Sequence, residues 1–512
     1  LFLGGVAANE GVVAAFQKRT GKDIHVPIDH DVTGAIGAAL LAMKGKAESS
    51  RFKGFDVDTD KVNIEGFQCM DCSNLCDVKK LNTDGGVVFF GGRCGKYDRK
   101  KKLESKLPDL FHERKRLLMG EDSSLIPHPS SLTKTVGIPM TLPFHEILPF
   151  WRGFFTSLGM KVVVTETGKK TIQKGIEAVV AETCFPVKVA HGHIADLLEK
   201  KVDYIFLPSI IDFSEGNQKN CYCPYIQALP YTIRSAMDLR GIKLLAPVVR
   251  FTLGRKELEK SLLRMTREAG IKGDVRDAVK AGMEAQRSFY TSMRDRGEEI
   301  LKGMKGDERG VVIVGRPYNT CDAALNMDIP SRLREIGVLP IPMDMLPLKG
   351  IDISDLWNDM YWSCGKKILS AARLISGDER LHAIYITNFG CGPDSFITRY
   401  FEEEMKGKPF LQLEVDEHSA DAGAITRCEA FVESLRNVKK SGIPAAARKP
   451  KIRGHEIKKR KMLLPPMTDH IHALSSALQA CGLDSSVLPM HDLESLELGK
   501  KYSTGRECYP YV

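Results

Sequence analysis

The sequence lacks any apolar run long enough to cross a membrane, and it lacks the common motifs of hydrolases and nucleotide-binding enzymes. A spanning helix needs about 20 apolar residues, and no stretch approaches that length. A Walker-type phosphate loop, a nucleophile elbow and an HExxH motif are all absent. No signal peptide is recognised either. We therefore expect a cytoplasmic protein without membrane association, whose chemistry does not depend on these motifs.

Positive charge is in modest excess and lies in short runs. The net charge is +9 over 512 residues, with basic clusters at residues 99–102, 114–116 and 458–461. Aromatic residues that stack on bases are not interleaved with these clusters. We interpret them as solvated linkers and expect no nucleic-acid partner.

The apolar pattern alternates between short strands and helices from residue 134 onward. Runs of four to six apolar residues predict strands, and the segments between them predict helices. The pattern therefore predicts an α/β fold of tandem Rossmann-like open parallel sheets, with one unit at 131–300 and a second at 308–436. The strands are expected at residues 136–139, 161–165, 176–181, 204–207, 310–315, 338–341 and 383–387.

Two shorter segments precede these units. Residues 1–48 begin with a glycine turn at Gly4 and Gly5, and we expect a helix at 11–19, a strand at 23–27 and a small-residue helical stretch at 33–39. A glycine turn that opens a helix is a reasonable place for a nucleotide.

Residues 67–97 form a compact cysteine module. A linker rich in Pro and Lys at 439–461 leads to a last segment at 462–512.

The last segment repeats an earlier one. Gly159 and Gly482 are 482 − 159 = 323 residues apart, and Cys184 and Cys508 are 508 − 184 = 324 apart. In both copies the cysteine is followed by an aromatic residue and a proline. This spacing predicts a duplicated helix-to-strand unit that ends in a cysteine loop. Because the second copy stops soon after its cysteine, we expect the chain to be an internal piece of a longer polypeptide.

The cysteine module has the spacing of a metal site. It contains Cys69, Cys72, Cys76 and Cys94, and four thiolates within 26 residues can surround one metal centre. A 4Fe–4S cluster and a structural zinc are both compatible with this ligand set. Four unrelated buried thiols are the remaining interpretation.

A second set of cysteines is dispersed among the α/β units. Cys184, Cys223 and Cys391 follow predicted strands, and loops at the carboxyl ends of parallel strands converge on one crevice. The three thiols are therefore candidate ligands of a shared metal centre, with Cys221 as an alternative to Cys223. Three ligands would leave one iron of a cluster open to substrate. Taken singly, each cysteine fits a core thiol better than a ligand, and it is their shared position after strands that favours a joint metal site.

Other reactive residues have simpler interpretations. Two histidines, His191 and His193, follow the Cys184 loop and are interpreted as core or surface residues rather than ligands. The acidic residues Glu182 and Asp394 and the nearby His418 are interpreted as loop-shaping or capping groups rather than general bases. The remaining cysteines are expected to be structural; they are Cys321, Cys364, Cys428 and Cys481.

Several motifs resemble those of the large acyl-CoA dehydratase activases, which are related to 2-hydroxyacyl-CoA dehydratases. The segment GGVAANEGVVAAF…TGAIGAALLA resembles the carboxyl-terminal end of a BadF/BadG/BcrA/BcrD-type ATPase domain, which has an actin-like fold. The segment FQCMDCSNLCDV…GGRCGKY resembles the cysteine module that follows that domain. The motifs ETCFPVK, CYCPYIQALPY, VGRPYN and FGCGPDSF resemble the dehydratase-like domain.

The resemblance implies an iron–sulfur protein of an ATP-driven electron-transfer system. It implies a 4Fe–4S cluster, in some relatives of double-cubane type, held here by Cys184, Cys223 and Cys391. It further implies ATP and Mg²⁺ in a preceding ATPase part, bordered here by Gly4, Gly5 and Asn9. The implied partners are a ferredoxin or flavodoxin as electron donor, a dehydratase component or an acyl-CoA substrate, and a second copy of the chain in a homodimer.

The sequence also departs from the family pattern. The phosphate loops of the ATPase are absent, so we do not expect the chain alone to hydrolyse ATP. The second dehydratase-like copy retains only Cys508 of its cysteines. The alternative function is a non-enzymatic α/β binding or scaffold protein with a structural zinc at Cys69–Cys94.

Overall fold

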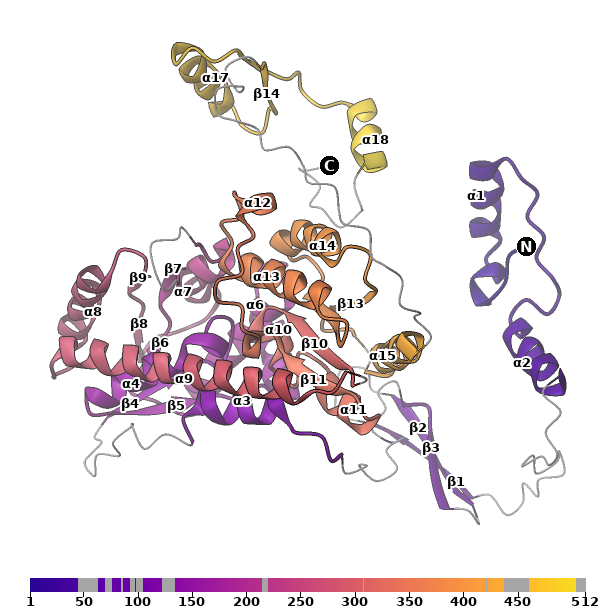
Figure 1. Ribbon diagram of the computed structural model, residues 1–512, viewed down its shortest axis with the longest axis horizontal. Helices are drawn as coiled ribbons and strands as arrows, with labels where there is room; N and C mark the ends of the chain where they lie inside the picture. Colours follow the sequence, from indigo (N-terminus) through magenta and orange to yellow (C-terminus); the bar gives the residue numbers. More distant parts are fainter. Residues whose placement is uncertain are drawn as a thin grey trace. The chain divides into compact units, whose positions relative to one another are not determined.

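The computed structural model separates into two compact units (Figure 1). One unit comprises Leu1–Glu65 with Leu81–Val87, and the other comprises Gly66–Lys80 with Val88–Val512. Within the parts of the chain that the structure describes, no helix is both long and apolar enough to cross a bilayer. The described residues are 1–44, 63–69, 76–83, 86–92, 97, 105–121, 134–213, 220–306, 308–419, 421–436 and 460–502.

The first residues of the chain form three helical elements, which are η1 (Gly5–Ala8), α1 (Glu10–Thr20) and α2 (Thr33–Lys44). The expected helices at 11–19 and 33–39 fall within α1 and α2. The expected strand at 23–27 is wrong, because this segment is irregular. The backbone N–H of Phe2 donates to the carbonyl oxygen of His25 at 2.9 Å, but Pro27 has no N–H with which to extend a ladder.

A small sheet carries two cysteines of the predicted module. Its strands are β1 (Asn63–Gln68), β2 (Asp77–Thr83) and β3 (Gly86–Phe90), in the order β1-β2-β3. Cys69 directly follows β1 and Cys76 directly precedes β2. Cys72 and Cys94 lie outside the described residues.

The larger unit contains the predicted α/β architecture. Its first sheet is fully parallel and has the order β5-β4-β6-β8, with a two-stranded parallel extension, β7-β9. The strands are β4 (Lys134–Ile138), β5 (Met160–Val164), β6 (Tyr204–Phe206), β7 (Ser209–Asp212), β8 (Lys243–Leu245) and β9 (Val248–Arg250). The helices are α4 (Phe144–Ser157), α5 (Lys169–Ala178), α6 (Phe185–Glu199), α7 (Pro224–Ala236), α8 (Arg255–Ala269) and α9 (Val275–Gly303), with α3 (Leu110–Met119) before the sheet.

The second sheet repeats the topology of the first. Its order is β11-β10-β12-β13, again fully parallel. In both sheets the strands, numbered along the chain, therefore run 2-1-3-4, the order of flavodoxin-like folds. The strands are β10 (Gly310–Gly315), β11 (Leu339–Pro342), β12 (Leu381–Asn388) and β13 (Phe410–Val415). The helices are α10 (Pro317–Thr320), α11 (Ile329–Glu335), η3 (Met343–Met345), α12 (Ser354–Trp357), α13 (Ser363–Gly377), α14 (Gly392–Met405) and α15 (Asp421–Arg436).

The expected strand at 176–181 is also wrong. Residues 176–178 are the end of α5, which packs closely on α6. The contact requires glycine on both helices. A methyl group at Gly175 of α5 would overlap the carbonyl oxygen of Lys188, and one at Gly192 of α6 would overlap that of Thr171. The apolar residues Ile172 and Ile176 are four positions apart, which is the spacing of one helix face. The loop of Cys184 therefore follows a helix rather than a strand.

The carboxyl-terminal segment repeats the first β-α-β unit. It contains β14 (Met462–Leu464), α17 (His470–Ala480), β15 (Ser485–Val487) and α18 (Leu493–Tyr502), with β14 and β15 parallel. Gly482 lies between α17 and β15 with φ of 78°, and Gly159 lies between α4 and β5 with φ of 73°. A left-handed φ favours glycine, which explains why both copies keep it. Cys508 lies outside the described residues.

Candidate functional site

The three dispersed cysteines occupy the same position on three different helices. Cys184 is the N-cap of α6, Cys223 is the N-cap of α7 and Cys391 is the N-cap of α14. A proline follows each of them within the first two helical positions, where its fixed φ suits the start of a helix. The exposed N–H groups and the dipole at a helix N-terminus favour a negatively charged sulfur.

The structure brings Cys184 into electrostatic range of both Cys223 and Cys391. Burial raises the pKa of Cys184 to about 11, and negative charge on Cys223 raises it in the same direction. Burial likewise raises the pKa of Cys391, with smaller contributions of the same sign from Asp394 and Cys184. The Cys184 and Cys391 thiols are therefore neutral at pH 7 when no metal is bound. Within the described ranges, no three His, Cys, Asp or Glu side chains are close enough to hold a metal ion as they stand.

Cys221 has a different environment from Cys223. Its backbone forms a parallel bridge with Trp362, with its N–H donating to Tyr361 and its carbonyl oxygen accepting from Ser363. This bridge ties the loop before α7 to the segment before α13.

A buried ion pair lies beside the thiols. Arg316 follows β10, Asp394 lies in the first turn of α14, and their Nη2 and Oδ1 atoms are 2.7 Å apart. The two side chains are only 3% and 2% exposed. The hydroxyl of Thr387 donates to the other carboxylate oxygen at 2.7 Å. The Arg316 charge lowers the pKa of both Cys184 and Cys391, so it favours their thiolate forms.

Several buried polar atoms of the larger unit have no hydrogen-bond partner among the described residues. They are Arg316 Nε, the hydroxyl groups of Tyr222 and Tyr385, and both amide atoms of Asn319. Buried polar groups are normally satisfied, and exceptions require an explanation such as a bound ion or water. Of these groups, Arg316 and Tyr385 interact with Cys391, so their unpartnered atoms are consistent with a polar or anionic group held near that thiol.

Arg316, Tyr385 and the ion-pair role of Asp394 were not predicted from the sequence. Cys364 was predicted to be structural, and the structure buries this thiol on α13 within range of the Arg316 charge. The one available signal was an arginine directly after the fully apolar strand β10, where a buried charge needs a partner.

A second buried carboxylate lies near Cys364. Glu146 on α4 is 3% exposed, accepts a hydrogen bond from the Tyr290 hydroxyl at 2.8 Å and forms an ion pair with Lys367. Its charge raises the pKa of Cys364, as does burial, which is the larger cause.

Of the two alternatives expected for the histidines after Cys184, core or surface, the structure shows core residues. His191 contacts the carbonyl oxygen of Val187 at 2.8 Å, and His193 is fully buried between the hydroxyl groups of Thr165 and Thr167 at 2.7 and 3.1 Å. Burial lowers the pKa of His193 to about 4. Both rings are therefore held neutral at pH 7.

A polar network continues from His193 into a cavity of about 300 Å³. The hydroxyl of Thr167 donates to Asp322, whose Oδ2 lies 3.7 Å from Nε2 of His145. Burial lowers the pKa of His145 to about 3 and raises that of Asp322. Burial therefore suppresses charge on both partners.

The amino-terminal candidates are described only in part. The backbone N–H of Cys69 donates to the carbonyl oxygen of Cys76 at 2.8 Å, which places these two residues side by side. Gly4 adopts φ of 86° before η1, and Gly5 is the first residue of η1. The side chain of Asn9 caps α1 by accepting from the N–H groups of Gly11 and Val12. Whether these residues border a nucleotide remains a prediction.

Comparison with known families gives one match. Residues 135–346 match a family model described as "CoA enzyme activase uncharacterised domain (DUF2229)". The matched range runs from β4 to the end of η3 and so includes Cys184, Cys223 and Arg316. It supports a CoA enzyme activase-like relationship for this part of the chain. No curated protein matches the sequence.

Similarity to solved structures is too weak to carry an argument. The substrate-binding protein FpvC of P. aeruginosa, in complex with Ni²⁺, is 11% identical, with 59% of this chain and 97% of that chain covered and a TM-score of 0.19. The carboxyl-terminal domain of glucosamine-fructose-6-phosphate aminotransferase from Francisella tularensis is 9% identical, with 66% and 96% covered and a TM-score of 0.17.

Proposed function

We propose that the chain is an iron–sulfur redox component of an ATP-driven electron-transfer system, of the kind that activates or resembles 2-hydroxyacyl-CoA dehydratases and acyl-CoA reductases. The family match at residues 135–346 supports an activase- or dehydratase-like function. The observation that carries the proposal is the arrangement of Cys184, Cys223 and Cys391 at the N-cap positions of three helices. Cys184 interacts with both other thiols, and the buried Arg316 interacts with Cys184 and Cys391.

The residues at this place fit a 4Fe–4S cluster. Three thiolates would hold it, and N–H groups at the three helix N-termini can donate to the sulfur atoms, which tunes a cluster's potential. Such a cluster supplies an iron with one open position, where electron transfer or Lewis-acid chemistry on a substrate oxygen takes place. A double-cubane centre would need further ligands and is the alternative form.

The surrounding residues of the chain have distinct roles in this proposal. The Arg316 guanidinium offsets the negative charge of the thiolates, and Asp394 holds that guanidinium in place. The buried Tyr318 and Tyr385 lie within electrostatic range of Cys391. Because the free thiols have raised pKa values, binding of metal must release protons.

The proposal extends to the amino-terminal module and to partners. Cys69, Cys72, Cys76 and Cys94 would hold a second 4Fe–4S cluster, with zinc as the alternative metal. Electrons would come from a ferredoxin or flavodoxin, driven by an ATPase part that binds ATP and Mg²⁺. They would pass to a dehydratase component or an acyl-CoA substrate, in the cytoplasm and with the chain as a monomer or homodimer.

Anaerobic reconstitution of the full chain tests the proposal. We expect bound iron and sulfide, and a paramagnetic signal after reduction with dithionite. Cys391→Ser should lose the iron of one site, whereas Cys481→Ser, at the exposed C-cap of α17, should retain it. A colourless protein without iron would contradict the proposal. Stoichiometric zinc without visible absorbance would favour the scaffold alternative instead.

A further inference from the structure

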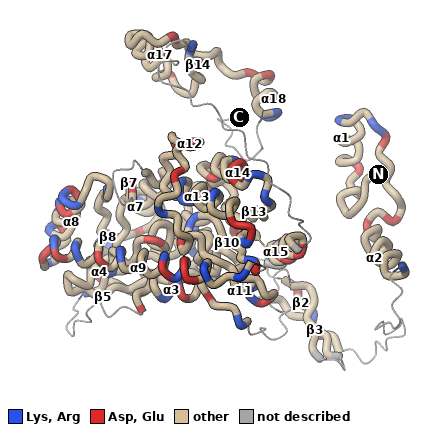
Figure 2. Tube along the Cα trace, viewed as in Figure 1, with Lys and Arg blue, Asp and Glu red and all other residues tan. Residues whose placement is uncertain are grey.

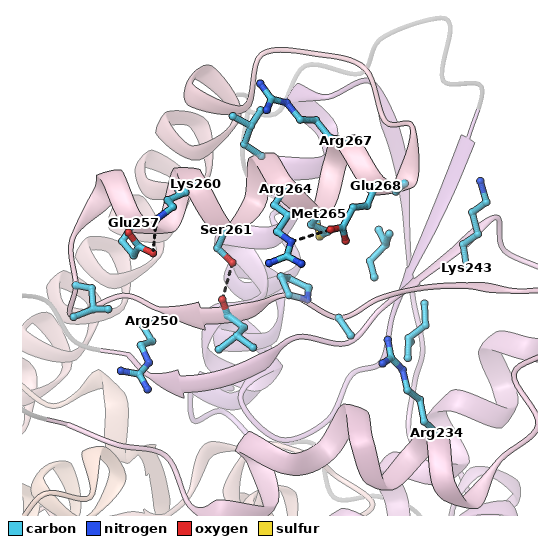
Figure 3. Close-up of a pocket in the computed structure, with 18 residues that line it drawn as sticks. Arg234, Lys243, Arg250, Glu257, Lys260, Ser261, Arg264, Met265, Arg267 and Glu268 are labelled. Atoms are coloured by element: carbon cyan, nitrogen blue, oxygen red, sulfur yellow. Dashed lines mark hydrogen bonds and ion pairs between the residues drawn. The ribbon is translucent and has the colours of Figure 1, made fainter.

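A large open pocket lies on the first sheet, away from the cysteines (Figure 3). It has a volume of about 1320 Å³ and lies between α8, the end of α7 and the β8–β9 segment. Its apolar lining includes Leu245 and Pro247 from the β8–β9 segment and Met265 from α8, all buried. Arg234 lines it near the carboxyl end of α7, whose N-cap is Cys223, 234 − 223 = 11 residues away. At 1.5 Å per residue the two residues are about 16 Å apart, so the pocket is separate from the thiol site.

The polar lining of the pocket is strongly basic. Six cationic and two acidic side chains line it, which gives 6 − 2 = +4, nearly half of the +9 carried by the whole chain. The cationic residues are Arg234, Lys243, Arg250, Lys260, Arg264 and Arg267. The acidic residues are Glu257 and Glu268.

Both carboxylates are already bound within α8. Glu268 accepts from Arg264 at 2.8 Å, and Glu257 lies 3.7 Å from Lys260 (Figure 3). Acidic and basic positions are interspersed along this helix (Figure 2). By contrast, Arg234, Arg250 and Arg267 have no carboxylate partner in the described part of the chain. The pocket therefore retains uncompensated positive charge at arginines from three elements.

The arginines and the apolar lining of the pocket favour some anionic ligands over others. Guanidinium groups bind phosphoryl groups in a planar, two-point geometry and are more weakly hydrated than ammonium groups. The cationic side chains are spread around the rim in Figure 3 rather than gathered at one point, so one phosphoryl group cannot contact all of them. The hollow shape and apolar lining suit a small organic molecule better than the flat surface of an acidic protein.

We propose that this pocket binds a small organic ligand that carries two or more phosphoryl groups. The phosphoryl groups at the ends of the ligand contact the arginines that line the pocket, and the apolar part of the ligand lies over Pro247 and Met265. This site is independent of any bound metal, so it can be tested in the chain without a cluster.

Calorimetric titration of the full chain with inorganic triphosphate tests this proposal. We expect saturable binding that weakens as salt is raised, because the contacts are between charges. The double variant Arg234→Ala/Arg267→Ala should bind at least ten-fold more weakly. The matched control is Arg240→Ala, because the Arg240 side chain is 91% exposed, pairs with Asp238 and does not line the pocket. The control should stay within two-fold of the unmodified chain, and circular dichroism should show that both variants remain folded.

Three results would overturn the proposal. One is the absence of saturable triphosphate binding by the folded chain. Another is equal weakening by Arg240→Ala, which would show only a general charge effect. The third is binding of a polyglutamate peptide as tight as that of triphosphate, because the site would then not recognise phosphoryl groups.

Discussion

Removal of the Asp394 carboxylate should destabilise the chain strongly, because it leaves Arg316 buried without a counter-charge. The two groups are 2.7 Å apart at their nearest atoms and almost fully buried. For charge centres about 4 Å apart and an effective dielectric constant of about 20, Coulomb's law gives about 4 kcal/mol. Thr387 also loses its acceptor, which costs about 1 kcal/mol. We therefore expect Asp394→Ala to lower the free energy of unfolding by about 3–5 kcal/mol.

Urea unfolding of the variant and two controls measures this loss. Asp238→Ala removes the same group from a solvent-exposed pair with Arg240 and should change stability little. The double variant Arg316→Met/Asp394→Leu removes both charges and should recover most of the loss, because no uncompensated charge is left. A loss below about 1 kcal/mol for Asp394→Ala would refute the reasoning, since breaking a buried ion pair costs more than that.

Other perturbations have equally specific outcomes. Burial holds the pKa of His193 near 4, below the 6.5 of the unfolded chain, so the unfolded state binds more protons as the pH falls from 6.5 to 4. His193→Gln should therefore reduce the loss of stability between pH 7.5 and pH 4 by up to about 3 kcal/mol, measured by urea unfolding; an unchanged pH profile would contradict this. A methyl group at Gly192 would overlap the carbonyl oxygen of Thr171, so Gly192→Ala should cost about 1–3 kcal/mol, whereas Gly303→Ala, which has open space around it, should not destabilise. Removal of bound iron by a chelator should lower the melting temperature of the reconstituted chain, because a ligand that binds only the native state stabilises it; no change in melting temperature would contradict this.

The architecture of the α/β part followed from the apolar pattern. Residues 310–315 form β10 with the predicted bounds, because a run of small and β-branched apolar residues between charged segments has no other stable place than a buried strand. The repeat was visible through Gly159 and Gly482, which both adopt a left-handed φ. The prediction of a strand at 176–181 was wrong because the apolar residues of this segment fit a helix face as well as a strand. The close packing of α5 on α6 decides between the two.

Only the cysteines of the candidate site could be predicted from the sequence. Cysteines next to prolines in loops are conspicuous in the sequence, and a rule about parallel sheets indicates where such loops meet. Arg316 and Asp394 are 78 residues apart, and neither has a neighbour in the sequence that marks it as a partner of the other. The role of each is fixed by burial and by the pairing of β10 with β12, which brings the ends of these two strands together and which no local pattern encodes.

The thiol trio has a consequence for how the protein matures. Cys184 and Cys223 belong to the first sheet and Cys391 to the second, 391 − 184 = 207 residues later. At a synthesis rate of about 5–20 residues per second, the ribosome exposes Cys184 for roughly 10–40 s before Cys391 is made. The proposed cluster, if it were inserted during that interval, would lack the Cys391 ligand, so its delivery should wait until translation has passed the second sheet.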